Sequence, residues 1–154
     1  MKKYLYNQFK KTAKNSYFYH QIKKPKNSTV KFFNFLKKNK CLKGNIIDCA
    51  CGNGANLIYL QKKYRYSKSL LGIEFNKILV KQSKKYLKNL KNIKVEKGNI
   101  LNIKKKYINK YDGVISIQTL SWLDDYENAV NEMAKLKPKF IAVTSLFWEG
   151  LIDF

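Results

Sequence analysis

The fold is decided by the stretch IIDCACGNGAN, Ile46 to Asn56, in which a short apolar run ends in an acid followed by small residues and glycines. An apolar run without alternation is typical of a strand buried on both faces. Gly52 and Gly54 permit positive φ and let a ligand approach the backbone closely. The stretch therefore predicts a buried strand, a tight turn and the beginning of a helix.

Working outward from this stretch, apolar strands alternate with amphipathic helices along the chain. We expect strands at 45–49, 69–74, 93–96, 112–117 and 140–145. Helices are expected from a cap at Ser28 to a point before Gly44, at 55–63, at 76–90 with Asn76 as its cap, and at 127–136. Strands that are apolar on both faces and separated by helices favour parallel pairing in a doubly wound α/β sheet, whose ligand lies beyond the carboxyl ends of the strands.

Length and composition indicate one domain. The 154 residues, 45% of them hydrophobic, suffice for a single core. Residues 1–27 form a basic and aromatic N-terminal extension that breaks at Lys24-Pro25, and residues 28–154 form the core domain. No apolar run reaches the roughly 20 residues of a membrane span and no secretory signal is present, so a soluble, cytoplasmic protein is expected.

The cysteine content and the net charge limit the kinds of site and partner expected of the chain. Cys41, Cys49 and Cys51, with one histidine in the chain, indicate free thiols rather than a disulfide framework or a metal site. The formal net charge is +22, almost all of it from lysine. A lysine surface attracts polyanions, but a solvated lysine face without a specific anionic partner is the alternative interpretation.

Two acids mark the expected ligand edge. Asp48 ends the first strand, and Glu74 ends the second, where a carboxylate can accept hydrogen bonds from both hydroxyls of a ribose. The third glycine of a dinucleotide fingerprint is replaced by Leu57, and no P-loop motif occurs. A carboxylate at Asp48 would repel a pyrophosphate but suits a cofactor that carries an ammonium group.

These motifs resemble class I S-adenosylmethionine-dependent methyltransferases. DCACGNG (48–54) resembles the first motif of that family, LLGIEFN (70–76) its second strand with the ribose-binding acid, and EKGNI (96–100) its third-strand turn. The stretch from 111 to 138 resembles the fourth strand, its loop and the following helix. The resemblance runs from about residue 44 to the end, and it implies a Rossmann-like sheet of five mainly parallel strands in the order 3-2-1-4-5.

The resemblance also implies a cofactor, S-adenosyl-L-methionine, and the residues that bind it. Asp48 would lie near its ammonium group, Glu74 would hold the ribose hydroxyls, and Asn99, often Asp in the family, would contact adenine without a charge. Leu120, Ser121 and Trp122 would face the sulfonium and the acceptor, unless Trp122 is a core aromatic residue. The implied cofactor-binding residues are Asp48, Ala50, Cys51, Gly52, Asn53, Gly54, Glu74, Phe75, Asn99, Ile100, Gln118 and Thr119.

The catalytic base is less defined. His20 lies in the extension, which often folds over the cofactor as a lid in the resembled family, and it is the candidate. Asp124 and Asp125 are rivals, although such a pair before a helix more naturally caps it. Cys49 and Cys51 are interpreted as packing residues rather than nucleophiles, because no neighbouring cation in the sequence would lower a thiol pKa.

The acceptor is expected to be a small molecule such as a sugar, lipid or metabolite. The stretch SIQTLSW (116–122) lacks the [DN]-P-P-[FYW] and Pro-Cys signatures of many nucleic-acid methyltransferases. Two alternatives stay open: an RNA-modifying methyltransferase that uses the lysine surface, or a non-catalytic fragment that needs a partner chain.

The resembled family usually carries two further strands, so the chain, which ends at Phe154, reads as truncated and of impaired activity. We expect its tail LFWEGLIDF (146–154) to fold back on the fifth strand or stay loose. The exposed edge of that strand could then pair with a partner chain or a second copy.

Overall fold

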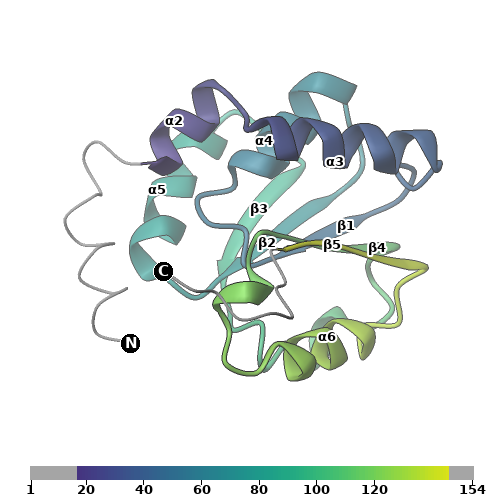
Figure 1. The fold of residues 1–154 in the computed structure, drawn as a ribbon. Helices are drawn as coiled ribbons and strands as arrows, with labels where there is room; N and C mark the ends of the chain where they lie inside the picture. The colour runs from purple at the N-terminus through teal and green to yellow at the C-terminus, as the bar shows by residue number, and fades with distance from the viewer. Residues whose placement is uncertain (1–16, 146–154) are drawn as a thin grey trace, which may run out of the picture.

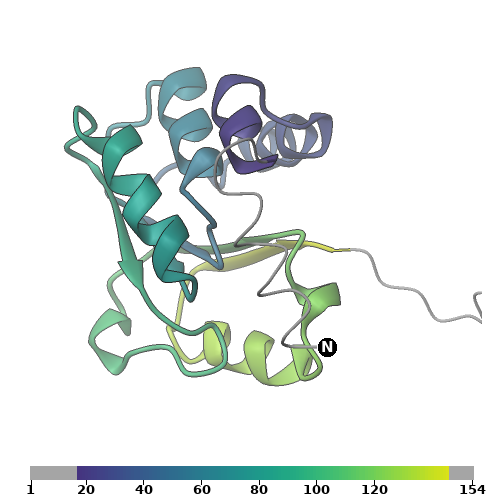
Figure 2. The ribbon, with the colours of Figure 1, turned by 90° about the vertical axis from the view of Figure 1, so that its left-hand side faces the viewer.

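The computed structural model describes residues 17–145, with side chains from residue 20 onward. Its architecture is a central sheet between two layers of helices, which the two perpendicular views show clearly (Figures 1 and 2). The tail at 146–154, with Phe147 and Trp148, and the first sixteen residues lie outside the described part of the chain.

The sheet confirms the expected strands and their order. Five strands follow the order β3-β2-β1-β4-β5, and every pairing is parallel. Asp48 in β1 lies beside Gly72 in β2, so Glu74 ends β2 close to the end of β1. The strands are β1 (Ile46–Cys49), β2 (Leu70–Glu74), β3 (Ile93–Lys97), β4 (Gly113–Ile117) and β5 (Phe140–Thr144).

Helices connect the strands and cover both faces. One layer contains α2, α3, α4 and α5, and α6 lies on the opposite face (Figure 1). The helices are α2 (Tyr17–Lys23), α3 (Asn27–Lys38), α4 (Ala55–Tyr64), α5 (Lys77–Leu87) and α6 (Tyr126–Ala134), with short 3₁₀ turns η1 (Lys105–Tyr107) and η2 (Leu120–Trp122). No helix in the described residues has the length and apolar character to cross a membrane.

The core consists of two apolar clusters, one on each face of the sheet. On the α3–α4 face, Phe33 and Leu57 pack against Ile46. On the α6 face, Met133 packs with Ile47 and other strand residues. Alternate residues of β1 therefore supply opposite clusters, which is why this strand reads as continuously apolar in the sequence.

Two of the three predicted caps hold. Asn76 accepts from the backbone N–H of Ile78 at the start of α5, and Asp125 accepts from Asn128 at the start of α6. The cap predicted at Ser28 is wrong: α3 begins at Asn27, and Lys26 occupies the N-cap position without a side-chain cap bond. The Ser28 hydroxyl instead accepts a hydrogen bond from Gln118, so a tertiary contact replaces the local one.

Gly72 makes the tight turn after β1 fit against β2. A Cβ built on Gly72 would overlap Cys51 Sγ and stand 2.9 Å from Cys51 Cβ. Cys51 is buried, so its side chain has little room to retreat. The glycine is therefore required by the close approach of the turn rather than by backbone conformation.

We predict that Gly72→Ala lowers the free energy of unfolding by about 1–3 kcal/mol, the usual cost of overpacking an interior. The measurement is urea denaturation of the variant and the wild type.

Adding Cys51→Ala should relieve part of this cost, because it removes the overlapping sulfur. A double-mutant cycle whose coupling term is zero would contradict the proposed contact. Gly98→Ala is the milder control, since its Cβ would stand 3.3 Å from Ile73 Cβ.

Candidate functional site

The carboxyl edge of the sheet gathers the acids of the N-terminal part of the chain. Asp48 and Glu74 are the only acidic residues among the first 95 positions of a strongly basic sequence. The fold brings them to one edge, at the ends of adjacent strands, and Glu74 is close enough to raise the pKa of Asp48. Two acids at one edge of a lysine-rich chain indicate a site selected for negative charge.

The turn between β1 and α4 has left-handed backbone conformations. Gly52 and Gly54 have φ of 60° and 83°, as their residue type allows. Ala50 also has a positive φ of 65°, which is costly for a residue with a Cβ. The turn is held by the N–H groups of Ala50 and Cys51, which donate to the Ile73 carbonyl at 2.9 and 3.1 Å.

The side-chain carboxylate of Glu74 also holds this turn in place. Its Oε2 accepts the backbone N–H of Gly52 at 2.8 Å, and its Oε1 accepts that of Asn76 at 2.8 Å. Burial raises the pKa of Glu74, and the N–H groups of Asn76, Gly52 and Phe75 oppose that rise. The bonds to Gly52 and Asn76 use one lone pair of each carboxylate oxygen, and the carboxylate has further lone pairs that can accept from a ligand.

Asp48 lies deeper than Glu74. Its side chain is 0% exposed, and neither carboxylate oxygen has a hydrogen-bond partner among the described residues. Burial raises its pKa well above the ordinary value, the Glu74 carboxylate adds to the rise, and the Asn56 side chain opposes it. The Thr29 hydroxyl donates to Asn56 Oδ1 at 3.2 Å, an orienting contact that the sequence analysis did not foresee.

The cysteines of the turn are packing residues, as predicted. Cys49 and Cys51 are buried, and burial raises the pKa of both thiols, with Asp48 adding to the effect. They therefore stay protonated and are poor nucleophiles. Asn53 is buried within the same turn.

The end of β4 connects the site to the N-terminal segment. Gln118 has a φ of 53°, and its N–H donates to the Thr144 carbonyl at 2.6 Å. Its side-chain amide donates to Ser28 Oγ at 3.2 Å and accepts from Lys26 Nζ at 3.4 Å. The segment between α2 and α3 therefore reaches the carboxyl edge, an arrangement that no local sequence signal indicated.

The remaining predicted residues divide by exposure. Phe75 is 70% exposed, and Trp122 is 68% exposed, so the interpretation of Trp122 as a core residue is wrong. Leu120 and Ile100 instead pack into the core on the α6 face, which leaves Leu120 unavailable to face an acceptor directly.

The side chains of Asn99 and Thr119 form hydrogen bonds with nearby backbone groups. The side chain of His20 is exposed. Asn99 Oδ1 accepts from the N–H of Leu101 at 3.0 Å, and the Thr119 hydroxyl donates to the Ile117 carbonyl at 3.3 Å. His20 is exposed on α2, which packs against α4. No group of three or more potential metal ligands occurs in the described residues.

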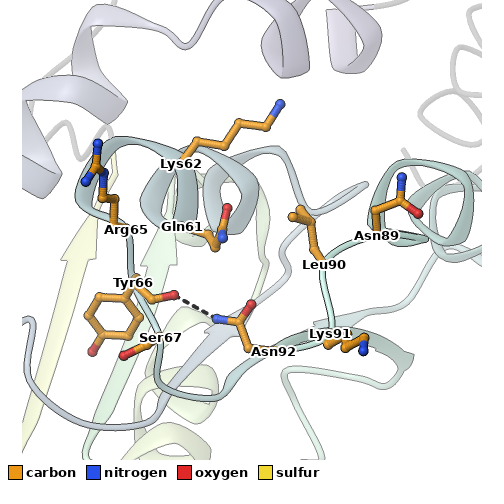
Figure 3. Close-up of a pocket in the computed structure, with 9 residues that line it drawn as sticks. All are labelled: Gln61, Lys62, Arg65, Tyr66, Ser67, Asn89, Leu90, Lys91 and Asn92. Atoms are coloured by element: carbon orange, nitrogen blue, oxygen red, sulfur yellow. Dashed lines mark hydrogen bonds between the residues drawn. The ribbon is translucent and has the colours of Figure 1, made fainter.

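A hollow of about 630 Å³ lies at the opposite edge of the sheet, between the ends of α4 and α5 (Figure 3). It is separate from the carboxyl edge and contains none of the predicted site residues. The arrangement around Asp48 and Glu74 instead brings together a partly buried carboxylate, a glycine turn and the N-terminus of α4.

Comparison with known proteins gives the family context. Residues 42–149 match a family model described as a methyltransferase domain. No curated protein matches the chain. Among solved structures, MccD protein is 18% identical with a TM-score of 0.66, covering 79% of this chain and 55% of its own.

Two further structures share the fold. A protein of Galdieria sulphuraria assigned as a sarcosine dimethylglycine methyltransferase is 20% identical with a TM-score of 0.62, over 70% of this chain and 40% of that one. The [4+2]-cyclase SpnF is 14% identical with a TM-score of 0.59, over 69% of this chain and 40% of that one. The chain thus spans about half or less of these proteins, and a cyclase among them shows that the fold alone does not fix the reaction.

We predict that Asp48→Asn raises the free energy of unfolding at pH 7 by about 1–3 kcal/mol, because a neutral amide removes the cost of ionising a buried carboxyl group. Because the folded pKa of Asp48 is raised, its contribution to stability is full below the ordinary value of 3.8 and is lost as pH rises toward the folded pKa. Urea denaturation between pH 4 and 8 should show a difference between variant and wild type that grows with pH.

Asp112→Asn is the control, and the pH dependence of its effect on stability should have the opposite sign. Its bond with Lys139 and the N–H of Asn45 lower the pKa of Asp112, so its contribution is present at neutral pH and is lost as pH falls. Equal pH dependence in both variants would contradict the assignment of Asp48.

Proposed function

The chain belongs to the methyltransferase-domain family, and from this premise we propose that it transfers a methyl group from S-adenosyl-L-methionine to a small-molecule acceptor. The observation that carries the proposal is the junction of the glycine turn with Glu74, which joins the first two motifs of the chain at the carboxyl edge. A sheet of this kind binds ligands at that edge, where the strand order reverses.

Glu74 fits the ribose of this cofactor. Both of its oxygens are held by backbone N–H groups, so the carboxylate is fixed in orientation before a ligand arrives. Its remaining lone pairs can accept two neighbouring hydroxyls, which a ribose presents. Phe75 and Asn99 flank this position, because the N–H of Gly98 donates to the Glu74 carbonyl at 3.0 Å, and we assign them and Ile100 to the adenine side.

The turn fits the amino-acid end of the cofactor. Asp48 has an orphaned buried carboxyl group, and a cation held next to the turn would offset the cost of its ionisation. Since Asp48 has no exposed surface, it would act on an ammonium group through the electrostatic field or a bridging water. The first turn of α4 supplies free N–H groups for a carboxylate, and the backbone from Ala50 to Gly54 would line the ligand.

The chain's own contribution to the chemistry is positioning. S-adenosyl-L-methionine supplies a methyl group already activated by a sulfonium, so the acceptor atom needs only to be held in line and shielded from water. We assign Gln118 and Thr119 to the methionine side, and the exposed Trp122 to the acceptor side. The N-terminal extension, whose Lys26 donates to Gln118, would form the lid, and His20 would take the proton of a hydroxyl acceptor.

A small acceptor is favoured over a nucleic acid. The loop after β4 lacks the signatures that present an exocyclic amine or a pyrimidine carbon, as its sequence SIQTLSW shows. The cationic hollow also lies at the opposite edge of the sheet from Glu74. An RNA held by that hollow would not by itself be delivered to the proposed site.

We predict that S-adenosylhomocysteine binds the chain and that Glu74→Gln weakens binding about 10- to 100-fold. The loss reflects hydrogen bonds to a charged acceptor, worth about 1.5–3 kcal/mol. Isothermal titration calorimetry and a thermal-shift titration measure it.

Glu127→Gln on α6 is the matched control and should bind like the wild type, because it changes an exposed acid on the far face. An absence of any stabilisation of the wild type by S-adenosylhomocysteine would overturn the proposed function.

We further predict that labelled S-adenosyl-L-methionine, incubated with the protein and a fractionated cell extract, transfers label to the small-molecule fraction. Label in the RNA fraction would instead favour the RNA-modifying alternative. Boiled protein and the Glu74→Gln variant serve as controls.

A further inference from the structure

The hollow at the amino ends of β2 and β3 is lined by cationic and polar side chains. Lys62 and Arg65 extend from the end of α4, and Lys91 lies in the loop before β3 (Figure 3). Arg65 is the only arginine of the chain. The other lining residues are Gln61, Tyr66, Ser67, Asn89, Leu90 and Asn92, none of them acidic.

Hydrogen bonds join the loops that form the floor of the hollow. The Asn92 amide donates to the Tyr66 carbonyl at 2.8 Å and to the Lys68 carbonyl at 3.0 Å, which joins the loops before β3 and β2. The Tyr66 hydroxyl donates to the Gly44 carbonyl, and burial raises the pKa of Tyr66 to about 12, so it stays protonated. These bonds connect the backbone of the loops from which Arg65 and Lys91 extend.

Within residues 20–145, no ion pair neutralises the positive charge around this hollow. No acidic residue occurs from 49 to 73 or from 75 to 95, the two segments that build the hollow. In the part of the chain that the structure describes, every ion pair uses an acid at position 96 or later in the sequence. Asp112, whose charge adds to the rise in the pKa of Tyr66, is itself bound to Lys139 at 2.8 Å.

We propose that this hollow binds the phosphate backbone of a nucleic acid, with Lys62, Arg65 and Lys91 as the phosphate contacts. A guanidinium binds phosphate through two parallel hydrogen bonds, and each neutralised phosphate releases counterions. Neutral donors such as Gln61, Ser67 and Asn89 suit phosphate and sugar oxygens without reading bases. The lining exposes no aromatic side chain that would anchor a membrane surface, which favours nucleic acid over lipid.

This surface is independent of the proposed methyl-transfer site. β2 spans five residues, so at about 3.3 Å per residue roughly 16 Å separates the hollow from Glu74. Binding there would dock the protein on a polyanion whatever molecule accepts the methyl group.

The test is fluorescence anisotropy with a labelled 20-nucleotide single-stranded RNA, titrated with the full chain at several salt concentrations. The triple variant Lys62→Gln, Arg65→Gln, Lys91→Gln should bind at least ten-fold more weakly at 0.1 M salt. The slope of log affinity against log salt should fall by about 2, since each of three lost contacts contributes roughly 0.7. Arg65→Lys alone should lose several-fold, because the charge stays and the fork is lost.

The matched control is Lys105→Gln, Lys110→Gln, Lys137→Gln, which removes three exposed lysines from other parts of the surface. This control variant should change the affinity for the RNA by less than about two-fold. Equal losses in both triple variants would overturn the proposal, because binding would then follow net charge alone. Binding to phosphatidylserine vesicles without binding to RNA would overturn it as well, and circular dichroism checks that each variant is folded.

Discussion

The hydrogen bond from the backbone N–H of Gly52 to the carboxylate of Glu74 organises the carboxyl edge of this protein. It joins residues 22 positions apart and fixes the turn after β1 against the end of β2. Gly72 supports the same junction by leaving room for Cys51. The strained conformation of Ala50 persists because these contacts over-determine it. Loss of this junction would release both the turn and the acid on which the proposed site depends.

The two edges of the sheet differ in charge. Asp48 and Glu74 concentrate negative charge at the carboxyl ends of the strands, whereas Lys62, Arg65 and Lys91 surround the hollow at the amino ends. In a chain of net charge +22, two acids that meet at one edge are a stronger functional signal than the abundant lysines. The separation also explains why a basic sequence does not by itself identify a nucleic acid as the methyl acceptor.

The N-terminal segment is the part of the site that local patterns failed to place. Ser28 has the residue type of a helix cap, but its hydroxyl is bonded to Gln118, whose own backbone is left-handed. Thr29 orients Asn56 beside Asp48 in a similar way. Both contacts join residues far apart in sequence, so propensities within a window of a few residues carry no information about them.

Local patterns predicted the strands, the parallel sheet and the edge that carries the acids, because hydrophobic periodicity and glycine spacing are local properties that the fold preserves. The strand order followed from the resemblance to a family and is confirmed by the register of the sheet. The packing of the folded chain is what buries Asp48 completely, leaves Trp122 exposed and brings Glu74 to the turn. Burial and long-range hydrogen bonds depend on which elements pack together, and no single segment encodes that packing.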